Sequence, residues 1–200
     1  MIIFLCRHGE TTGDIEDRYG GDYEDELSKN GKSQVSGLAE KLKNQNIEVV
    51  FHSPKHRAIQ TAQIVSKALN VKTIVAKDFR ERNAYGVLTG LIKLDAQKKY
   101  PLEVQKLQMD KINHSVCCSE NYSVFKARVL NEFSNTTSSK KYNTVCIITH
   151  GGPISCIVRE LLNLGEIKKL SDCAILKINS SEDSLDLIES SGMELEQQLK

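Results

Sequence analysis

Long hydrophobic runs are missing from this sequence of 200 residues. The apolar stretch at its start covers only residues 2–6, which is too short for the core of a signal peptide and far too short to cross a bilayer. Charge of one sign is missing as well, since 27 Lys and Arg residues stand against 26 Asp and Glu residues and leave a formal net charge of +1. We therefore expect neither a membrane nor a nucleic acid as a partner.

Proline is scarce, with three residues, and no stretch rich in Pro, Gly or Ser divides the chain. Its length suits one domain of ordinary size, which can bury a sufficient hydrophobic core without disulfides or metal ions to stabilise it. We predict a single domain over residues 1–189, with a small cap or insertion at about 90–122 and a C-terminal tail at 190–200.

The six cysteines show no CxxC spacing, which removes the usual signature of a redox or zinc motif. Four of them lie in apolar segments, where a thiol packs as a small hydrophobic group. The adjacent pair Cys117 and Cys118 is interpreted as two thiols in a loop. This usage predicts reduced thiols and a cytoplasmic location.

Strands and helices alternate along the chain. Buried strands are predicted at 2–6, 47–53, 71–76 and 144–150, amphipathic helices at 32–43, from Pro54 to Leu69 and after Gly151-Gly152-Pro153, and a closing hairpin from 174–178 and 183–189. Pro54 is expected in the first turn of its helix. The alternation predicts an α/β fold, a three-layer αβα sandwich around a mostly parallel central sheet.

Two of the predicted strands end in His-Gly: residues 2–6 lead into Arg7-His8-Gly9, and the later strand ends at His150-Gly151. Ligands bind beyond the carboxyl ends of parallel strands, so His8 and His150 face one crevice if these strands are neighbours. Glycines there allow close backbone approach and bring helix-start amides near an anion. Arg7 beside His8, and Arg57 after the second strand, supply guanidinium groups that match phosphate oxygens.

Other interpretations of these histidines stay open from the residues alone. A single histidine at a strand end is most often a hydrogen-bonded structural residue. Metal binding by His8 and His150 lacks carboxylate or cysteine ligands at a recognisable spacing, and no HExxH pattern exists. We therefore predict no metal site and no cofactor.

Five motifs follow one another along the chain: Arg7-His8-Gly9-Glu10-Thr11, Leu27-Ser28-x-x-Gly31-x-x-Gln34, Ser53-Pro54-x-x-Arg57-Ala58-x-Gln60-Thr61-Ala62, Glu81-Arg82-x-x-x-Gly86-x-x-x-Gly90 and His150-Gly151-Gly152. In this order they resemble the histidine phosphatase superfamily, the phosphoglycerate mutase-like group of enzymes that work through a phosphohistidine. The resemblance runs from residue 2 to about 178 and implies a phosphoglycerate mutase-like fold.

The resemblance implies a role for each of five residues. His8 attacks phosphorus as a neutral imidazole and becomes phosphohistidine. Arg7, Arg57 and His150 hold the equatorial oxygens of the phosphoryl group. Glu81 protonates the leaving oxygen and then activates water.

The segment after the first motif departs from the family pattern. Asp14 stands where the family usually has asparagine, and a carboxylate cannot donate to phosphate. Either Asp14 points away from the phosphate, or it binds a cationic or hydroxyl group of the substrate. Our hypothesis is that Asp14 weakens affinity for free phosphate. Gly20 and Gly21 match positions at which the family has small residues that approach the substrate. Gly151, directly after His150, is also expected to bind substrate. The surplus of acids over 14–26 fits either a solvated surface or selection against extra negative charge.

The resemblance favours a phosphomonoesterase that transfers the phosphoryl group of small phosphorylated metabolites to water. The alternatives are a phosphoglycerate-type mutase, a phosphoprotein phosphatase, or a phospho-ligand-binding module without catalysis. The short span from Glu81 to His150 favours hydrolysis over mutase chemistry. The sequence leaves the substrate and the oligomeric state open.

Overall fold

A six-stranded sheet forms the centre of the computed structural model, which describes residues 1–109, 115–138, 141–181 and 184–196. The strands are β1 (Ile2–Arg7), β2 (Val49–His52), β3 (Lys72–Val75), β4 (Thr144–Thr149), β5 (Ile167–Ser180) and β6 (Leu185–Leu195). Their order is β3-β2-β4-β1-β5-β6; the first four are parallel, β5 is antiparallel to β1 and β6 is antiparallel to β5. The predicted α/β fold with a mixed, largely parallel sheet is confirmed.

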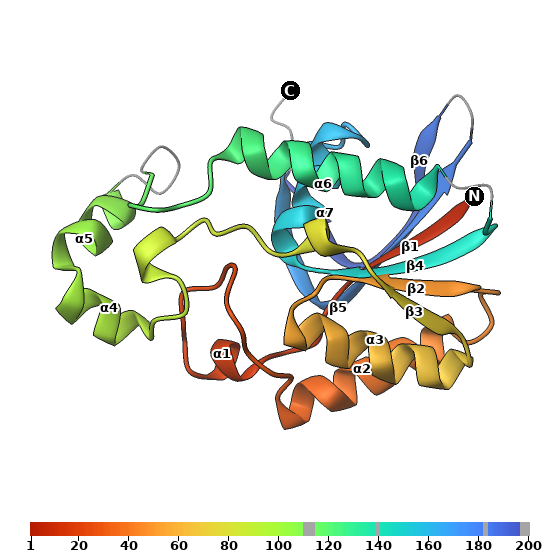
Figure 1. Ribbon diagram of the computed structural model, residues 1–200, viewed down its shortest axis with the longest axis horizontal. Coiled ribbons are helices and arrows are strands. Elements are labelled where there is room, and N and C mark those ends of the chain that lie inside the picture. Colours follow the sequence, from red (N-terminus) through yellow and green to blue (C-terminus); the bar gives the residue numbers. More distant parts are fainter. Residues whose placement is uncertain (110–114, 139–140, 182–183, 197–200) are drawn as a thin grey trace.

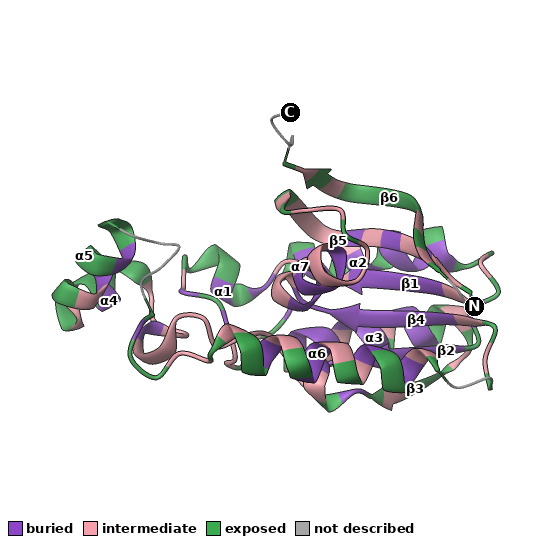
Figure 2. Cartoon of the chain, turned by 90° about the horizontal axis from the view of Figure 1, so that it is seen from above, coloured by how far each residue is buried: buried purple, intermediate pink, exposed green. Residues whose placement is uncertain are grey.

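Helices cover both faces of the sheet (Figures 1 and 2). The chain forms α1 (Thr12–Ile15), α2 (Lys29–Leu42), α3 (His56–Leu69), α4 (Lys93–Lys99), α5 (Pro101–Met109), α6 (Tyr122–Thr137) and α7 (Gly151–Glu160). Alternate residues of β1 enter opposite cores: Ile3 and Leu5 pack with α6 and α7, whereas Phe4 and Cys6 pack with α2 and α3. A strand buried on both faces is therefore a continuous apolar run in the sequence.

A separate lobe lies beyond the carboxyl ends of the parallel strands and contains α4 and α5 (Figures 1 and 2). It has its own small hydrophobic cluster, in which Tyr19 packs with Leu88, Ala96, Val104 and Leu107. The acidic segment after β1 thus contributes an aromatic side chain to the lobe.

Two expectations differ from the structure. Helix α3 begins at His56 with Lys55 as its N-cap, so Pro54 precedes the helix and does not lie in its first turn. The closing hairpin is longer than predicted, because β5 starts at Ile167 and β6 continues to Leu195. Residues 190–195 therefore belong to a strand and not to a tail, and 197–200 lie outside the described residues.

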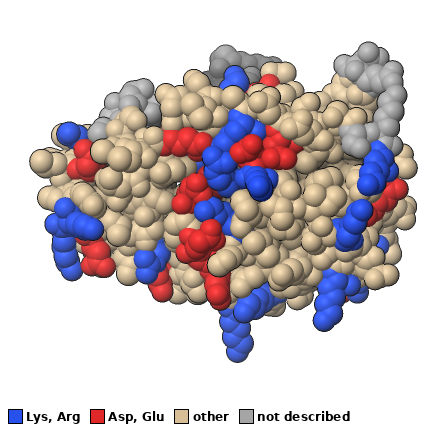
Figure 3. Space-filling view, in the orientation of Figure 1, with Lys and Arg blue, Asp and Glu red and all other residues tan. Residues whose placement is uncertain are grey.

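Acidic and basic side chains lie close to one another on the face in Figure 3, with large uncharged areas around them, in keeping with the near-zero formal charge. None of the helices in the described ranges is long and apolar enough to span a membrane.

Candidate active site

His8 and His150 meet at the carboxyl ends of two neighbouring strands. β1 and β4 pair in parallel, with Arg7 beside Thr149. The next residue after each strand therefore enters the same space. The two imidazole rings lie 5.0 Å apart between centroids, at 63° to one another. Their exposed fractions are 5% for His8 and 0% for His150. The predicted convergence of these two residues is confirmed.

The ring of His8 has a defined orientation. Its Nδ1 lies 2.8 Å from the carbonyl oxygen of Gly9, and its Nε2 lies 3.2 Å from Nε of Arg57. A carbonyl only accepts, so Nδ1 carries the proton and Nε2 presents a lone pair. Burial, followed by the charges of Arg57 and Arg7, holds the pKa of His8 well below its ordinary value of 6.5. His8 is therefore a neutral imidazole whose Nε2 carries the lone pair.

His150 lies between Arg57 and Ser53. Its Nδ1 accepts from Nε of Arg57 at 3.1 Å, and its Nε2 lies 2.7 Å from Oγ of Ser53. Nε2 is therefore the protonated nitrogen, and it donates to the hydroxyl. Burial, then the charge of Arg57, lowers the pKa of His150 well below 6.5. Ser53 belongs to the third sequence motif, but sequence reasoning assigned it no role.

Arg57 is buried and takes most of its acceptors from the acidic segment. Nη1 donates to Oδ1 of Asp25 at 2.7 Å and to the carbonyl of Tyr23 at 2.9 Å, and Nη2 donates to the carbonyl of Gly21 at 3.0 Å. The exposed fractions of the two charged side chains are 4% for Arg57 and 6% for Asp25. The sequence pointed to Arg57 and missed Asp25, because a run of acids is normally a solvated surface.

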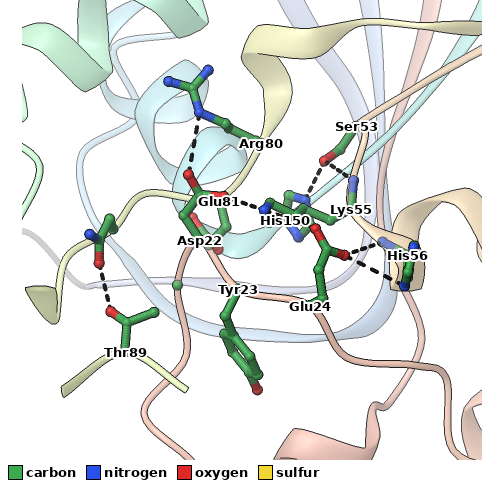
Figure 4. Close-up of polar contacts among 12 residues, drawn as sticks. Asp22, Tyr23, Glu24, Ser53, Lys55, His56, Arg80, Glu81, Thr89 and His150 are labelled. Atoms are coloured by element: carbon green, nitrogen blue, oxygen red, sulfur yellow. Dashed lines mark hydrogen bonds and ion pairs between the residues drawn. The ribbon is translucent and has the colours of Figure 1, made fainter. Parts of the chain in front are cut away.

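Two further carboxylates of the segment surround Lys55 (Figure 4). Asp22 lies 2.6 Å and Glu24 3.0 Å from its Nζ, and Glu24 also accepts from the backbone N–H of His56 at 3.0 Å. The acidic segment is thus fixed to the start of α3, directly beside Arg57.

The side chain of Glu81 lies next to the N-terminus of α7. Oε2 of Glu81 accepts from the N–H of Gly152 at 3.1 Å, which is a favourable place for a carboxylate. A Cβ on Gly152 would lie 2.2 Å from Oε1 of Glu81, so a larger residue there would displace the carboxylate. Arg128 fixes the backbone at Glu81, because its guanidinium donates to the carbonyls of Arg80 and Glu81. The same guanidinium forms an ion pair with Glu120 at 2.7 Å.

A cavity of about 330 Å³ opens beside Glu81. Its walls are glycines, aromatic rings and two arginines: Gly20, Gly21, Glu81, Arg82, Ala84, Tyr85, Tyr122, Phe125, Gly152, Ser155 and Arg159. The structure therefore places the predicted residues Gly20 and Gly21 on the same cavity as Glu81. Gly21 has a positive φ of 124°, a conformation that favours glycine.

The remaining predicted residues lie around this centre. Nη1 of Arg7 donates to the carbonyl of Leu170 at 2.6 Å and lies 3.3 Å from Asp172, a partner that the sequence did not indicate. Gly151 is the first residue of α7. Asp14 is exposed, and its carboxylate accepts from the N–H of Thr11 at 2.9 Å in the capping box of α1. A contact of Asp14 with substrate stays a prediction.

Comparisons with known proteins identify the family of the chain. The family model of the histidine phosphatase superfamily (branch 1) matches residues 3–188. Phosphoglycerate mutase-like protein 4 of Arabidopsis thaliana is 29% identical over 76% of this chain and 67% of its own length. Phosphoserine phosphatase 1 of Hydrogenobacter thermophilus is 24% identical over 81% of this chain and 76% of its own.

A solved structure has the same fold at low sequence identity. The alpha-ribazole phosphatase from Shigella flexneri superposes with a TM-score of 0.80, at 19% identity and over 94% of each chain. Since the family model covers nearly the whole chain, the protein belongs to the histidine phosphatase superfamily and is an enzyme of its phosphatase type.

Proposed function

We propose that the enzyme hydrolyses phosphomonoesters of small metabolites through a phosphohistidine on His8, without a metal ion. The observation that carries this proposal is the neutral His8 ring, with Nδ1 fixed by Gly9 and the Nε2 lone pair directed toward Arg57. Guanidinium groups can offset the charge of a transferring phosphoryl group in the way that a cation would.

The reaction has two steps. Nε2 of His8 attacks phosphorus as the bond to the leaving oxygen breaks, and protonated Glu81 gives its proton to that oxygen. Glu81, now a carboxylate, then takes a proton from water while the water oxygen attacks phosphorus. The second step releases inorganic phosphate and restores both His8 and protonated Glu81. In this scheme Arg7, Arg57 and His150 bind phosphoryl oxygens.

The cavity beside Glu81 supports a small leaving group as its occupant. Its volume of about 330 Å³ is at the lower end of small-molecule sites. The guanidinium of Arg82 stacks on Tyr122 at 5.3 Å and donates to the carbonyl of Glu120, and it pairs with no carboxylate in the described part of the chain. A leaving group with a carboxylate or a planar ring fits these walls. Phosphoserine and alpha-ribazole phosphatases among the similar proteins support this size class.

A second candidate function is phosphoryl transfer to another hydroxyl group, as in a phosphoglycerate-type mutase. The observation that favours it is the burial of His8, because a mutase must keep water from its phosphohistidine.

We place the enzyme in the cytoplasm, where the free thiols of the buried residues Cys6, Cys146 and Cys156 would stay reduced.

A panel of small phosphomonoesters that includes phosphoserine and 3-phosphoglycerate, assayed with a metal chelator, tests this function. We expect release of inorganic phosphate by the wild type and by His56→Gln, which alters an exposed histidine outside the site, and none by His8→Ala. Conversion of 3-phosphoglycerate to 2-phosphoglycerate without phosphate release would establish the mutase instead. Activity that survives in His8→Ala, or requires a divalent ion, would overturn the proposal.

A further inference from the structure

The groups that must bind a phosphoryl group are enclosed by the protein itself. Taken as whole residues, His8, Arg57 and His150 have exposed fractions of 5%, 3% and 0%. Arg57 uses its Nε–H, both Nη1 protons and one Nη2 proton on protein acceptors, which leaves one N–H for any other acceptor. Arginine recognises phosphate through two parallel N–H groups, and Arg57 cannot do so in this arrangement.

We infer that Gly21–Asp25 form a latch on the phosphate site, in which the carboxylate of Asp25 holds Nη1 of Arg57 that a phosphoryl group of the substrate would use. This inference rests on the proposed phosphatase function. A carboxylate and a phosphoryl group offer arginine the same acceptor pattern, so the substrate competes with Asp25 for Nη1 of Arg57.

Contacts on both sides of Arg57 hold the latch shut. Lys55 binds Asp22 and Glu24, and the hydroxyl of Tyr23 donates to Oδ2 of Asp25 at 3.1 Å. Burial, then the charge of Asp25, raises the pKa of Tyr23, so this hydroxyl keeps its proton. Polar contacts of Lys55, which lies between β2 and α3, and of Tyr23 within the segment therefore keep the latch closed.

Displacement of Asp25 requires the segment to move. A carboxylate as buried as Asp25 is costly to leave without its arginine. While Asp25 stays bound, Arg57 has one N–H left and cannot offer a phosphate two free N–H groups. Phosphate binding and opening of the latch are therefore coupled. The measured phosphate affinity equals the intrinsic affinity reduced by the fraction of molecules that are open.

Asp25→Asn, with the dissociation constant of inorganic phosphate measured by calorimetry, tests the latch. The matched control is Glu26→Gln, which removes the same charge from the neighbouring, exposed position. We expect Asp25→Asn to tighten phosphate binding by about three- to tenfold because the open fraction rises. Glu26→Gln is expected to change it less than twofold, which separates loss of the contact from loss of a charge.

An unchanged or weaker phosphate affinity in folded Asp25→Asn would overturn the inference and make Asp25 a residue that positions Arg57. Should that variant fail to fold, Tyr23→Phe decides, because it keeps the carboxylate and removes its hydrogen bond. It must also tighten phosphate binding, by a smaller factor, and an unchanged constant refutes the latch. A wild type that neither binds phosphate nor hydrolyses any phosphomonoester contradicts the proposed function, whereas a hydrolysing wild type with no effect of Asp25→Asn contradicts the latch alone.

Discussion

Nδ1 of His8 donates to the carbonyl oxygen of Gly9 at 2.8 Å. This contact between adjacent residues fixes which nitrogen of the imidazole carries its proton. The remaining nitrogen, Nε2, lies next to Arg57. The backbone at the end of β1 thus determines which atom of His8 is available for attack.

Replacement of Glu81 by Gln tests its role as an acid. An amide cannot transfer a proton to the leaving oxygen, so hydrolysis of alkyl phosphates should slow by about 100-fold or more. The effect on p-nitrophenyl phosphate should be much smaller, because its leaving group needs little protonation. Steady-state kcat on both substrates measures the difference, and equal losses would remove the acid role.

Gly152→Ala should reproduce the effect of losing Glu81 without altering the carboxylate itself. A Cβ at this position would lie 2.2 Å from Oε1 of Glu81 and would displace it. Gly37→Ala is the control, because a Cβ on Gly37, in α2, would meet no atom within 4 Å. We expect a loss of at least tenfold in kcat on alkyl phosphates for Gly152→Ala, with p-nitrophenyl phosphate less affected. If Gly37→Ala shows the same loss, crowding of Glu81 is not the cause.

Ser53→Ala removes the acceptor of the His150 Nε2–H at 2.7 Å. A neutral hydrogen bond contributes about 1 kcal/mol, so kcat/KM should fall by roughly five- to tenfold. Thermal unfolding should shift only slightly, which separates a misplaced His150 from a general loss of stability. Full activity in Ser53→Ala would mean that Arg57 alone orients His150.

Protein stability should fall as the pH drops below about 6.5. The pKa values of His8 and His150 lie well below 6.5 in the folded chain because of burial and then Arg57. The unfolded chain takes up protons near pH 6.5 that the folded chain refuses, so each histidine lowers the free energy of unfolding by up to about 1.4 kcal/mol per pH unit in that range. Urea unfolding at pH 7, 6 and 5 measures this slope.

Two variants identify the source of the pH dependence. His8→Asn and His150→Asn should each give a shallower slope than the wild type, because each removes one buried histidine. An identical slope in all three proteins would show that the buried histidines are not responsible.

The core strands and the histidine pair could be predicted from sequence for a physical reason. Strands buried on both faces are continuous apolar runs, and the parallel pairing of β1 with β4 brings their ends together. Residues 167–173 of β5 were missed because they lie beyond the residues that pair with β1 and carry mixed polarity. Only Ile167, Lys169 and Leu170 among them have ladder partners in β6. Strand propensity is weak where neither face is fully covered.

The contacts of the acidic segment could not be predicted. Asp25 meets Arg57 across 32 positions of sequence without a periodic pattern. Nothing in a run of acids distinguishes the buried carboxylate of Asp25 from the exposed one of Glu26. Ser53 raises the same difficulty, since a serine before a proline commonly marks only a turn.

The most direct test of the account is the location of the phosphoryl group in enzyme quenched during turnover. Mass spectrometry under alkaline conditions, which preserve phosphohistidine, together with ³¹P NMR identifies the modified residue and atom. The account predicts one phosphoryl group on Nε2 of His8, because Nδ1 is occupied by the carbonyl of Gly9. A phosphoryl group on another residue, or on Nδ1 of His8, would contradict it.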